Sequence, residues 1–237
     1  MKNKFLMTAG IVSILFACAS FIVLNNKAET NQGKWISLFD GKTFNGWHGF
    51  NKTGTVPNWA IEDGAMVCLG AAADAHGGDL VTDAAYENFE LKWEWKITKG
   101  GNSGVMYHVL EGEKYAGPYQ TGPEYQLIDD IGFPEKLEAW QMTGADYAMT
   151  IPNDKKKLKP VGEWNTSKIV FNKAHVEHWL NGEKILEFQA WDEAWMNKKT
   201  TGKWKGYPDY GTAKKGLIAL QDHGNKVYFK NIMIKVL

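Results

Sequence analysis

Cysteine is nearly absent from this chain, with two in 237 residues. Cys18 lies in an N-terminal apolar run, and Cys68 lies in a predicted strand, Ala65 to Leu69. The folded part therefore has no internal disulfide and no zinc site built from paired cysteines. Without such crosslinks the hydrophobic core must supply the stability, and we expect Cys68 to be a buried, inert member of it.

An excess of charge of either sign is also missing, because 27 Lys and Arg balance 27 Asp and Glu. A neutral chain gives no electrostatic footprint for nucleic acid, and we expect no such partner. The run Lys155 to Lys157 is interpreted as a solvated loop. There is no Gly-x-Ser-x-Gly elbow, no phosphate-binding glycine loop before a helix, and no internal repeat.

Histidines at metal-ligand spacing are lacking too. His175 and His178 are three residues apart, a spacing that aligns side chains on a helix but not on a strand. We therefore predict no metal site and no cofactor. A calcium ion held by oxygen ligands stays open, since such sites need no fixed spacing.

The long hydrophobic run of the chain is N-terminal. Lys2 and Lys4 precede a charge-free stretch from Phe5 to Leu24, as in a secretory signal. Three readings are open: cleavage near Ala17-Cys18-Ala19, lipidation of Cys18, or an uncleaved anchor about 30 Å long as a helix. Each places the rest of the chain outside the cytoplasm, in the periplasm or cell envelope, with membrane contact only through this segment or a lipid. We assign 1–33 to this segment and a linker.

Strand patterns fill the remainder, 34–237, which we expect to be one domain. From Phe89 to Thr98 apolar and polar residues alternate, which predicts a half-buried antiparallel strand. Asp63-Gly64 and Asn181-Gly182 separate apolar runs and predict tight hairpins. Many short strands with almost no helical pattern favour a β-sandwich. The long connection 131–161 is expected to be functional or partly helical. A second long connection, 190–210, is rich in Trp and Lys.

The candidate site begins on the stretch from Gly122 to Asp130. On a strand Glu124, Gln126 and Ile128 share one face, so a carboxylate and an amide stand in a row. A glycosidase needs two carboxyls about 5 to 9.5 Å apart. Asp130 shares the face but would lie about 20 Å from Glu124, so this strand cannot supply an ordinary glycosidase pair.

A partner for Glu124 is therefore sought elsewhere, and the turn Gln221-Asp222-His223-Gly224 is the best candidate. Histidine titrates near neutrality and suits general acid or base catalysis. Asp222 either orients His223 or caps the turn.

These motifs occur in an ordered series that resembles the 3-keto-disaccharide hydrolase family of secreted bacterial proteins. The series runs from Trp35 to the C-terminus: Leu38-Phe39-Asp40-Gly41-Lys42, Gly46-Trp47, Asn102-Ser103-Gly104, Glu124 to Asp129, Gly162-Glu163-Trp164-Asn165, Leu180-Asn181-Gly182 and Leu220 to Gly224. The resemblance implies an all-β, concanavalin A-like jelly-roll β-sandwich of two antiparallel sheets with a concave sugar-binding face. Many members carry Arg shortly after Asn-Ser-Gly, where this chain has Val105 to His108.

The resemblance also implies the activity: an exported hydrolase or lyase that cleaves 3-keto-glycosides. A ketone at C3 acidifies the C2 hydrogen, one base removes it, the glycosidic oxygen leaves C1, and water adds afterwards. Glu124 and His223 are the expected catalytic pair, with base and acid unassigned. The expected substrate-binding residues are Asn102, Tyr107, His108, Gln126, Gln221 and Asp222. The rivals are a non-catalytic sugar-binding module, and an endo-glycanase, which the lack of a Glu-x-Asp-x-x-Glu run disfavours.

Overall fold

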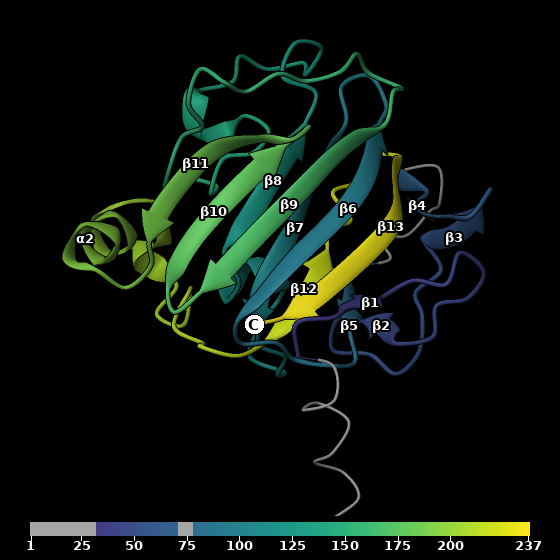
Figure 1. Ribbon diagram of the computed structural model, residues 1–237, viewed down its shortest axis with the longest axis horizontal. Coiled ribbons are helices and arrows are strands. Elements are labelled where there is room, and N and C mark those ends of the chain that lie inside the picture. Colours follow the sequence, from purple (N-terminus) through teal and green to yellow (C-terminus); the bar gives the residue numbers. More distant parts are fainter. Residues whose placement is uncertain (1–31, 71–77) are drawn as a thin grey trace, which may run out of the picture.

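The computed structural model describes residues 32–70 and 78–237, and these form two antiparallel sheets packed face to face (Figure 1). The larger sheet has eight strands in the order β11-β10-β9-β6-β13-β4-β3, with β1 paired to β13. Its strands are β1 (Trp35–Ser37), β3 (Trp59–Glu62), β4 (Ala65–Cys68), β6 (Phe89–Ile97), β9 (Asn165–Asn172), β10 (His175–Leu180), β11 (Glu183–Gln189) and β13 (Val227–Val236).

The smaller sheet lies behind the larger one in Figure 1 and has the order β2-β5-β12-β7-β8. Its strands are β2 (Trp47–Gly49), β5 (Leu80–Thr82), β7 (Asn102–Val109), β8 (Glu124–Ile128) and β12 (Leu217–Leu220). Sequence neighbours pair in β3-β4, β7-β8 and β9-β10-β11, whereas β13 pairs with β4 and β6, and β12 with β5 and β7, from distant parts of the sequence. The predicted fold class, an all-β jelly-roll sandwich of two antiparallel sheets, is confirmed.

The core fills the space between the sheets. Along β6 every second residue is buried, from Phe89 to Ile97, and the residues between them are partly exposed. Tyr125 and Leu127 of β8 and Val105 and Tyr107 of β7 meet this face from the smaller sheet. The alternation read from the sequence thus marks the buried face of β6 correctly, because side chains alternate across a strand.

Both predicted hairpins are present. In the turn between β3 and β4 Asp63 has φ 49° and Gly64 has φ 74°. In the turn between β10 and β11 Asn181 has φ 49° and Gly182 has φ 91°. Two consecutive residues with positive φ give the turn whose twist suits a two-residue hairpin.

Other elements differ from the sequence prediction. The glycine-rich stretch Gly100 to Gly104 predicts a turn, but Asn102 to Gly104 are the first residues of β7. Strand β5 has no counterpart in the prediction. The connection 190–210 contains the helix α2 (Glu193–Thr201), whose N-cap Asp192 accepts a hydrogen bond from the Trp195 N–H at 2.7 Å. Short 3₁₀ turns occur at η2 (Pro118–Gln120), η3 (Ala139–Gln141) and η4 (Lys203–Gly206).

The connection 131–161 covers the outer edge of β8. Gly144 N–H donates to Gln126 O at 2.8 Å, Ala145 O accepts from Gln126 N–H at 3.1 Å, and Tyr147 N–H donates to Glu124 O at 3.1 Å. Because these bonds satisfy the backbone of an edge strand, all five residues of β8 are buried. Strand β8, the floor of the candidate site, is therefore hydrogen-bonded along both edges, to β7 on one side and to the connection 131–161 on the other.

The N-terminal targeting segment, with Cys18, falls within residues 1–31 and lies outside the described residues. Within the described ranges, no helix has the length and apolar character needed to span a bilayer. Cys68 is free and fully buried on β4, and burial raises the pKa of its thiol, as predicted for an inert cysteine.

Candidate active site

A cavity of about 320 Å³ lies against the outer face of the smaller sheet. Since Tyr125 and Leu127 point into the core, Glu124 and Gln126 point to the opposite face, where this cavity opens. It is large enough for a sugar-sized ligand. The residues that line it are Asp79, Asn102, Ala116, Gly117, Tyr119, Glu124, Gln126, Tyr147, Lys203, Trp204, Gln221, Asp222 and His223.

Glu124 is the buried acid of this cavity. Its side chain is 4% exposed, and its carboxyl group makes no hydrogen bond or ion pair with any residue in the described part of the chain. The carboxyl lies directly over Gly104 of the neighbouring strand β7, where a Cβ atom would overlap Glu124 Oε1. The glycine of the Asn-Ser-Gly motif thus provides the space in which the carboxyl sits.

Burial raises the pKa of Glu124 from 4.5 to about 8. The Lys203 ammonium opposes this shift, while the carboxylates of Asp79 and Asp146 reinforce it. A carboxyl with a pKa near neutrality, with no partner and facing a cavity, is suited to accept or give a proton.

Asp79 is a second acid in the cavity, and the sequence analysis did not single it out. Its Oδ1 accepts a hydrogen bond from the Asp222 N–H at 2.7 Å. Burial raises the pKa of Asp79 to about 7, against the lowering effect of this hydrogen bond. Asp79 and Glu124 therefore form a pair of acids that disfavour each other's ionisation.

Asp222 caps its own turn and does not hydrogen-bond to His223. Its Oδ1 accepts from Gly224 N–H at 3.0 Å and from the Cys68 thiol at 3.2 Å, and its Oδ2 accepts from Asn58 Nδ2 at 2.9 Å. Of the two roles expected for Asp222, the structure supports capping. These three donors fix the turn that carries His223.

His223 lies at the exposed side of the cavity and makes no hydrogen bond with another described residue. Its imidazole is therefore open both to solvent and to the cavity. Glu124 and His223, which are far apart in sequence, line the same cavity.

Three amides complete the polar lining. Gln126 Nε2 donates to Asn102 Oδ1 at 3.3 Å, which orients both side chains on adjacent strands. Gln221 Oε1 is buried without a hydrogen-bond partner among the described residues. A buried polar atom left unpaired in the free protein is available to a ligand.

The remaining wall is aromatic and was not predicted residue by residue. Tyr147 and Trp204 pack edge to face with centroids 6.3 Å apart, and Lys203 Nζ lies 4.1 Å from the Tyr147 ring centroid. Trp204 comes from η4, in the Trp- and Lys-rich connection that the sequence did mark as unusual. Aromatic side chains beside a few polar groups are typical of ligand-binding pockets.

Tyr107 and His108, which we expected to bind substrate, lie elsewhere. Both are 1% exposed, and neither lines the cavity. At His108 the pairing of β7 with β12 shifts, and the residue has φ 54°, a local bulge. The bulge turns His108 inward, where its ring centroid lies 4.3 Å from that of Phe171. The pKa of His108 falls to about 4 because it is buried.

Potential metal ligands gather on the larger sheet rather than in the cavity. Ligand atoms of His175, Glu177 and Glu187 lie within 4.8 Å of one another. Lys184 Nζ lies 3.3 Å from Glu177 Oε1 and 2.5 Å from Glu187 Oε2. The Lys184 ammonium therefore already neutralises these two carboxylates. The expected calcium alternative stays a prediction.

Comparison with known proteins agrees with this geometry. Residues 34–235 match the 3-keto-alpha-glucoside-1,2-lyase-like domain. A 3-keto-disaccharide hydrolase of Bacteroides thetaiotaomicron is 39% identical over 228 residues, which cover 86% of this chain and 78% of the relative.

Solved structures agree as well. A Parabacteroides distasonis protein provisionally described as a glycosyl hydrolase is 47% identical, with a TM-score of 0.80 over 91% of this chain and 98% of its own. A second such protein from that organism is 27% identical, with a TM-score of 0.66 over 86% of this chain and 100% of its own. The chain belongs to the 3-keto-alpha-glucoside-1,2-lyase-like family and is a glycosidic-bond hydrolase.

Proposed function

We propose that the protein cleaves 3-keto-glycosides, such as 3-keto-disaccharides, by elimination followed by hydration. The observation that carries the proposal is the state of Glu124: a buried carboxyl, without a partner among the described residues, facing a sugar-sized cavity. The activity of the Bacteroides relative points to the same substrate class.

The reaction begins at C2 of the keto sugar. The Glu124 carboxylate removes the C2 proton, and the C–H electron pair forms an enolate with the C3 ketone. The electron pair returns to form a C1–C2 double bond as the C1–O bond breaks and the aglycone oxygen takes a proton. Water then adds at C1, and C2 regains a proton, so the net result is hydrolysis.

The residues of the cavity supply the groups that these reaction steps need. Glu124 is the base, and its raised pKa makes it a stronger proton acceptor than an ordinary carboxylate. Asn102, Gln126 and Gln221 line the cavity, and their amide groups can donate to the enolate oxygen and sugar hydroxyls. His223, at the solvent side, is assigned as the proton donor to the leaving oxygen.

The test compares a 3-keto-disaccharide with its parent disaccharide on the purified protein. We expect cleavage of the keto form only, because the parent lacks an acidic C2 hydrogen. Binding without turnover of the keto form would favour a non-catalytic module. Equal cleavage of both sugars would instead indicate a conventional glycosidase mechanism.

Export is the second part of the proposal and rests on the basic, then apolar N-terminus. We expect cell fractionation to find the protein in the periplasm or envelope, with a Cys18→Ser variant released from membranes if Cys18 is lipidated. Full-length protein in the cytoplasmic fraction contradicts the export proposal.

A further inference from the structure

One wall of the active-site cavity is formed by the loop between β7 and β8. The connection between β7 and β8 leaves the smaller sheet at Leu110 and returns at Pro123. Within it Ala116, Gly117 and Tyr119 line the cavity. The position of this loop therefore determines the shape of the cavity opposite Glu124.

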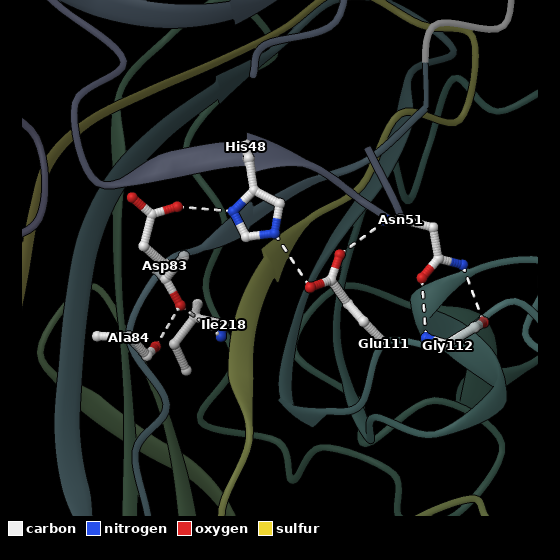
Figure 2. Close-up of polar contacts among 8 residues, drawn as sticks. His48, Asn51, Asp83, Ala84, Glu111, Gly112 and Ile218 are labelled. Atoms are coloured by element: carbon white, nitrogen blue, oxygen red, sulfur yellow. Dashed lines mark hydrogen bonds and ion pairs between the residues drawn. The ribbon is translucent and has the colours of Figure 1, made fainter. Parts of the chain in front are cut away.

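The first residue of the loop, Glu111, is held by a histidine of another strand. Figure 2 shows His48, on β2, between two carboxylates. His48 Nε2 lies 3.0 Å from Glu111 Oε2, and His48 Nδ1 lies 2.6 Å from Asp83 Oδ1. The His48 side chain is 21% exposed and that of Glu111 is 29% exposed, whereas the Asp83 side chain lies largely in solvent.

Two carboxylates on one imidazole require both ring nitrogens to carry protons. Burial lowers the pKa of His48, but the hydrogen bonds and charges of Glu111 and Asp83 outweigh it, and the net shift is upward. The two carboxylates thus favour the imidazolium form of His48, in which both contacts are charge-assisted hydrogen bonds.

Asn51 strengthens the same junction (Figure 2). Glu111 Oε1 accepts from the Asn51 N–H at 2.7 Å, and the Asn51 side chain bonds both the N–H and the carbonyl of Gly112, at 2.8 and 3.1 Å. Its Nδ2 also donates to Tyr115 O at 3.0 Å. We call His48, Asn51, Asp83 and Glu111 the loop clamp.

A second attachment lies further along the loop. Tyr115 OH and Lys114 Nζ each lie 2.8 Å from Asp209 Oδ2. Asp209 follows η4, which carries Lys203 and Trp204 of the opposite wall. The clamp fixes the start of the loop, and Asp209 ties its middle to the other side of the cavity.

The His48 residue of the loop clamp lies far from Glu124. Paired residues His48, Val81, Ala219, Met106 and Glu124 form one row across the smaller sheet. Four strand spacings separate the ends of this row, which is about 19 Å at ~4.8 Å each. His48 does not reach a ligand beside Glu124, so any effect on the reaction passes through the loop.

We propose that His48 is a positioning residue of this hydrolase: by clamping Glu111 it holds the β7–β8 loop in the place where it forms the substrate-binding wall. Loss of the clamp weakens binding of the sugar and leaves the proton-transfer groups in place. The inference rests on the proposed function only for its choice of substrate.

The test compares His48→Gln with a matched control, His175→Gln. His175 Nε2 likewise lies between two carboxylates, 3.6 Å from Glu177 Oε1 and from Glu187 Oε2, but on the larger sheet. For His48→Gln we expect KM for the keto sugar to rise about three- to tenfold with kcat within about twofold. The control should change neither.

Trypsin provides a readout that needs no substrate. Lys114 in the loop is 69% exposed, so cleavage after it reports whether the loop is held. His48→Gln should be cleaved there several times faster than wild type, and the control should not. Glu111→Gln should reproduce His48→Gln, and the double variant should be no worse than either one, because the two residues form one contact.

Three outcomes overturn the proposal. They are an unchanged KM, a fall in kcat alone, or equal trypsin rates in wild type and His48→Gln. If the wild-type protein fails to turn over the keto sugar, the proposed function fails. The clamp is then judged on trypsin cleavage together with direct binding of the sugar.

Discussion

The substitution Glu124→Gln tests two effects of the carboxyl group separately: its contribution to turnover and its effect on the free energy of unfolding. Gln keeps the size of Glu but cannot ionise. In the wild type the folded state holds the carboxyl at a pKa of about 8, against 4.5 when the chain is unfolded. Because the folded state binds the proton more tightly, the contribution of Glu124 to stability is fully present below pH 4.5 and is lost as pH rises toward 8.

The size of the effect follows from the shift. A change from 4.5 to about 8, at ~1.4 kcal/mol per unit, corresponds to at most about 5 kcal/mol at pH 8 and above. The Gln variant lacks this destabilisation. We therefore expect it to match the wild type at about pH 4 and to become more stable by several kcal/mol by pH 8.

The assay is urea unfolding of both proteins at intervals from pH 4 to pH 9, together with turnover of the keto sugar. Turnover should fall about 10²- to 10⁴-fold, the usual contribution of a general acid–base group. Asp79 ionises in both proteins, but in the Gln variant it no longer faces the Glu124 charge, so its titration adds to the stability difference in the same direction. A stability difference that does not change with pH would refute the burial argument, and unchanged turnover would remove Glu124 from the chemistry.

Three further predictions use the same assays. Gly104→Ala should leave the protein folded but abolish most turnover, because the added methyl group displaces the Glu124 carboxyl; normal activity would contradict this. Lys203→Met should raise the pKa of Glu124 further by removing a nearby cation, so the rise of kcat/KM with pH should move to higher pH; an unmoved profile counts against this pairing. His223→Asn should lower kcat about 10²-fold or more with little change in KM if His223 is the proton donor; a change in KM alone would limit it to binding.

Local pattern in the sequence determined the strands and turns. The alternation in Phe89 to Ile97 and the Asp-Gly and Asn-Gly turns depend on neighbouring residues, and they appear in the structure as expected. The ordered motifs also marked the residues that meet in the cavity, because Glu124, Gln126 and Asn102 lie on paired strands. By contrast, the sequence of α2 has no amphipathic pattern, and only the N-cap residue Asp192 indicates that a helix begins there.

The tertiary structure alone decided what surrounds these groups. His108 is turned inward by a bulge at its pairing with β12, a matter of register between strands 100 residues apart in sequence or more. Asp79 and Lys203 reach Glu124 from other connections, and their charges with its burial set its pKa. Strand register and desolvation depend on the packing of segments distant in sequence. For that physical reason no local pattern could reveal a buried acid or the loop that His48 holds beside it.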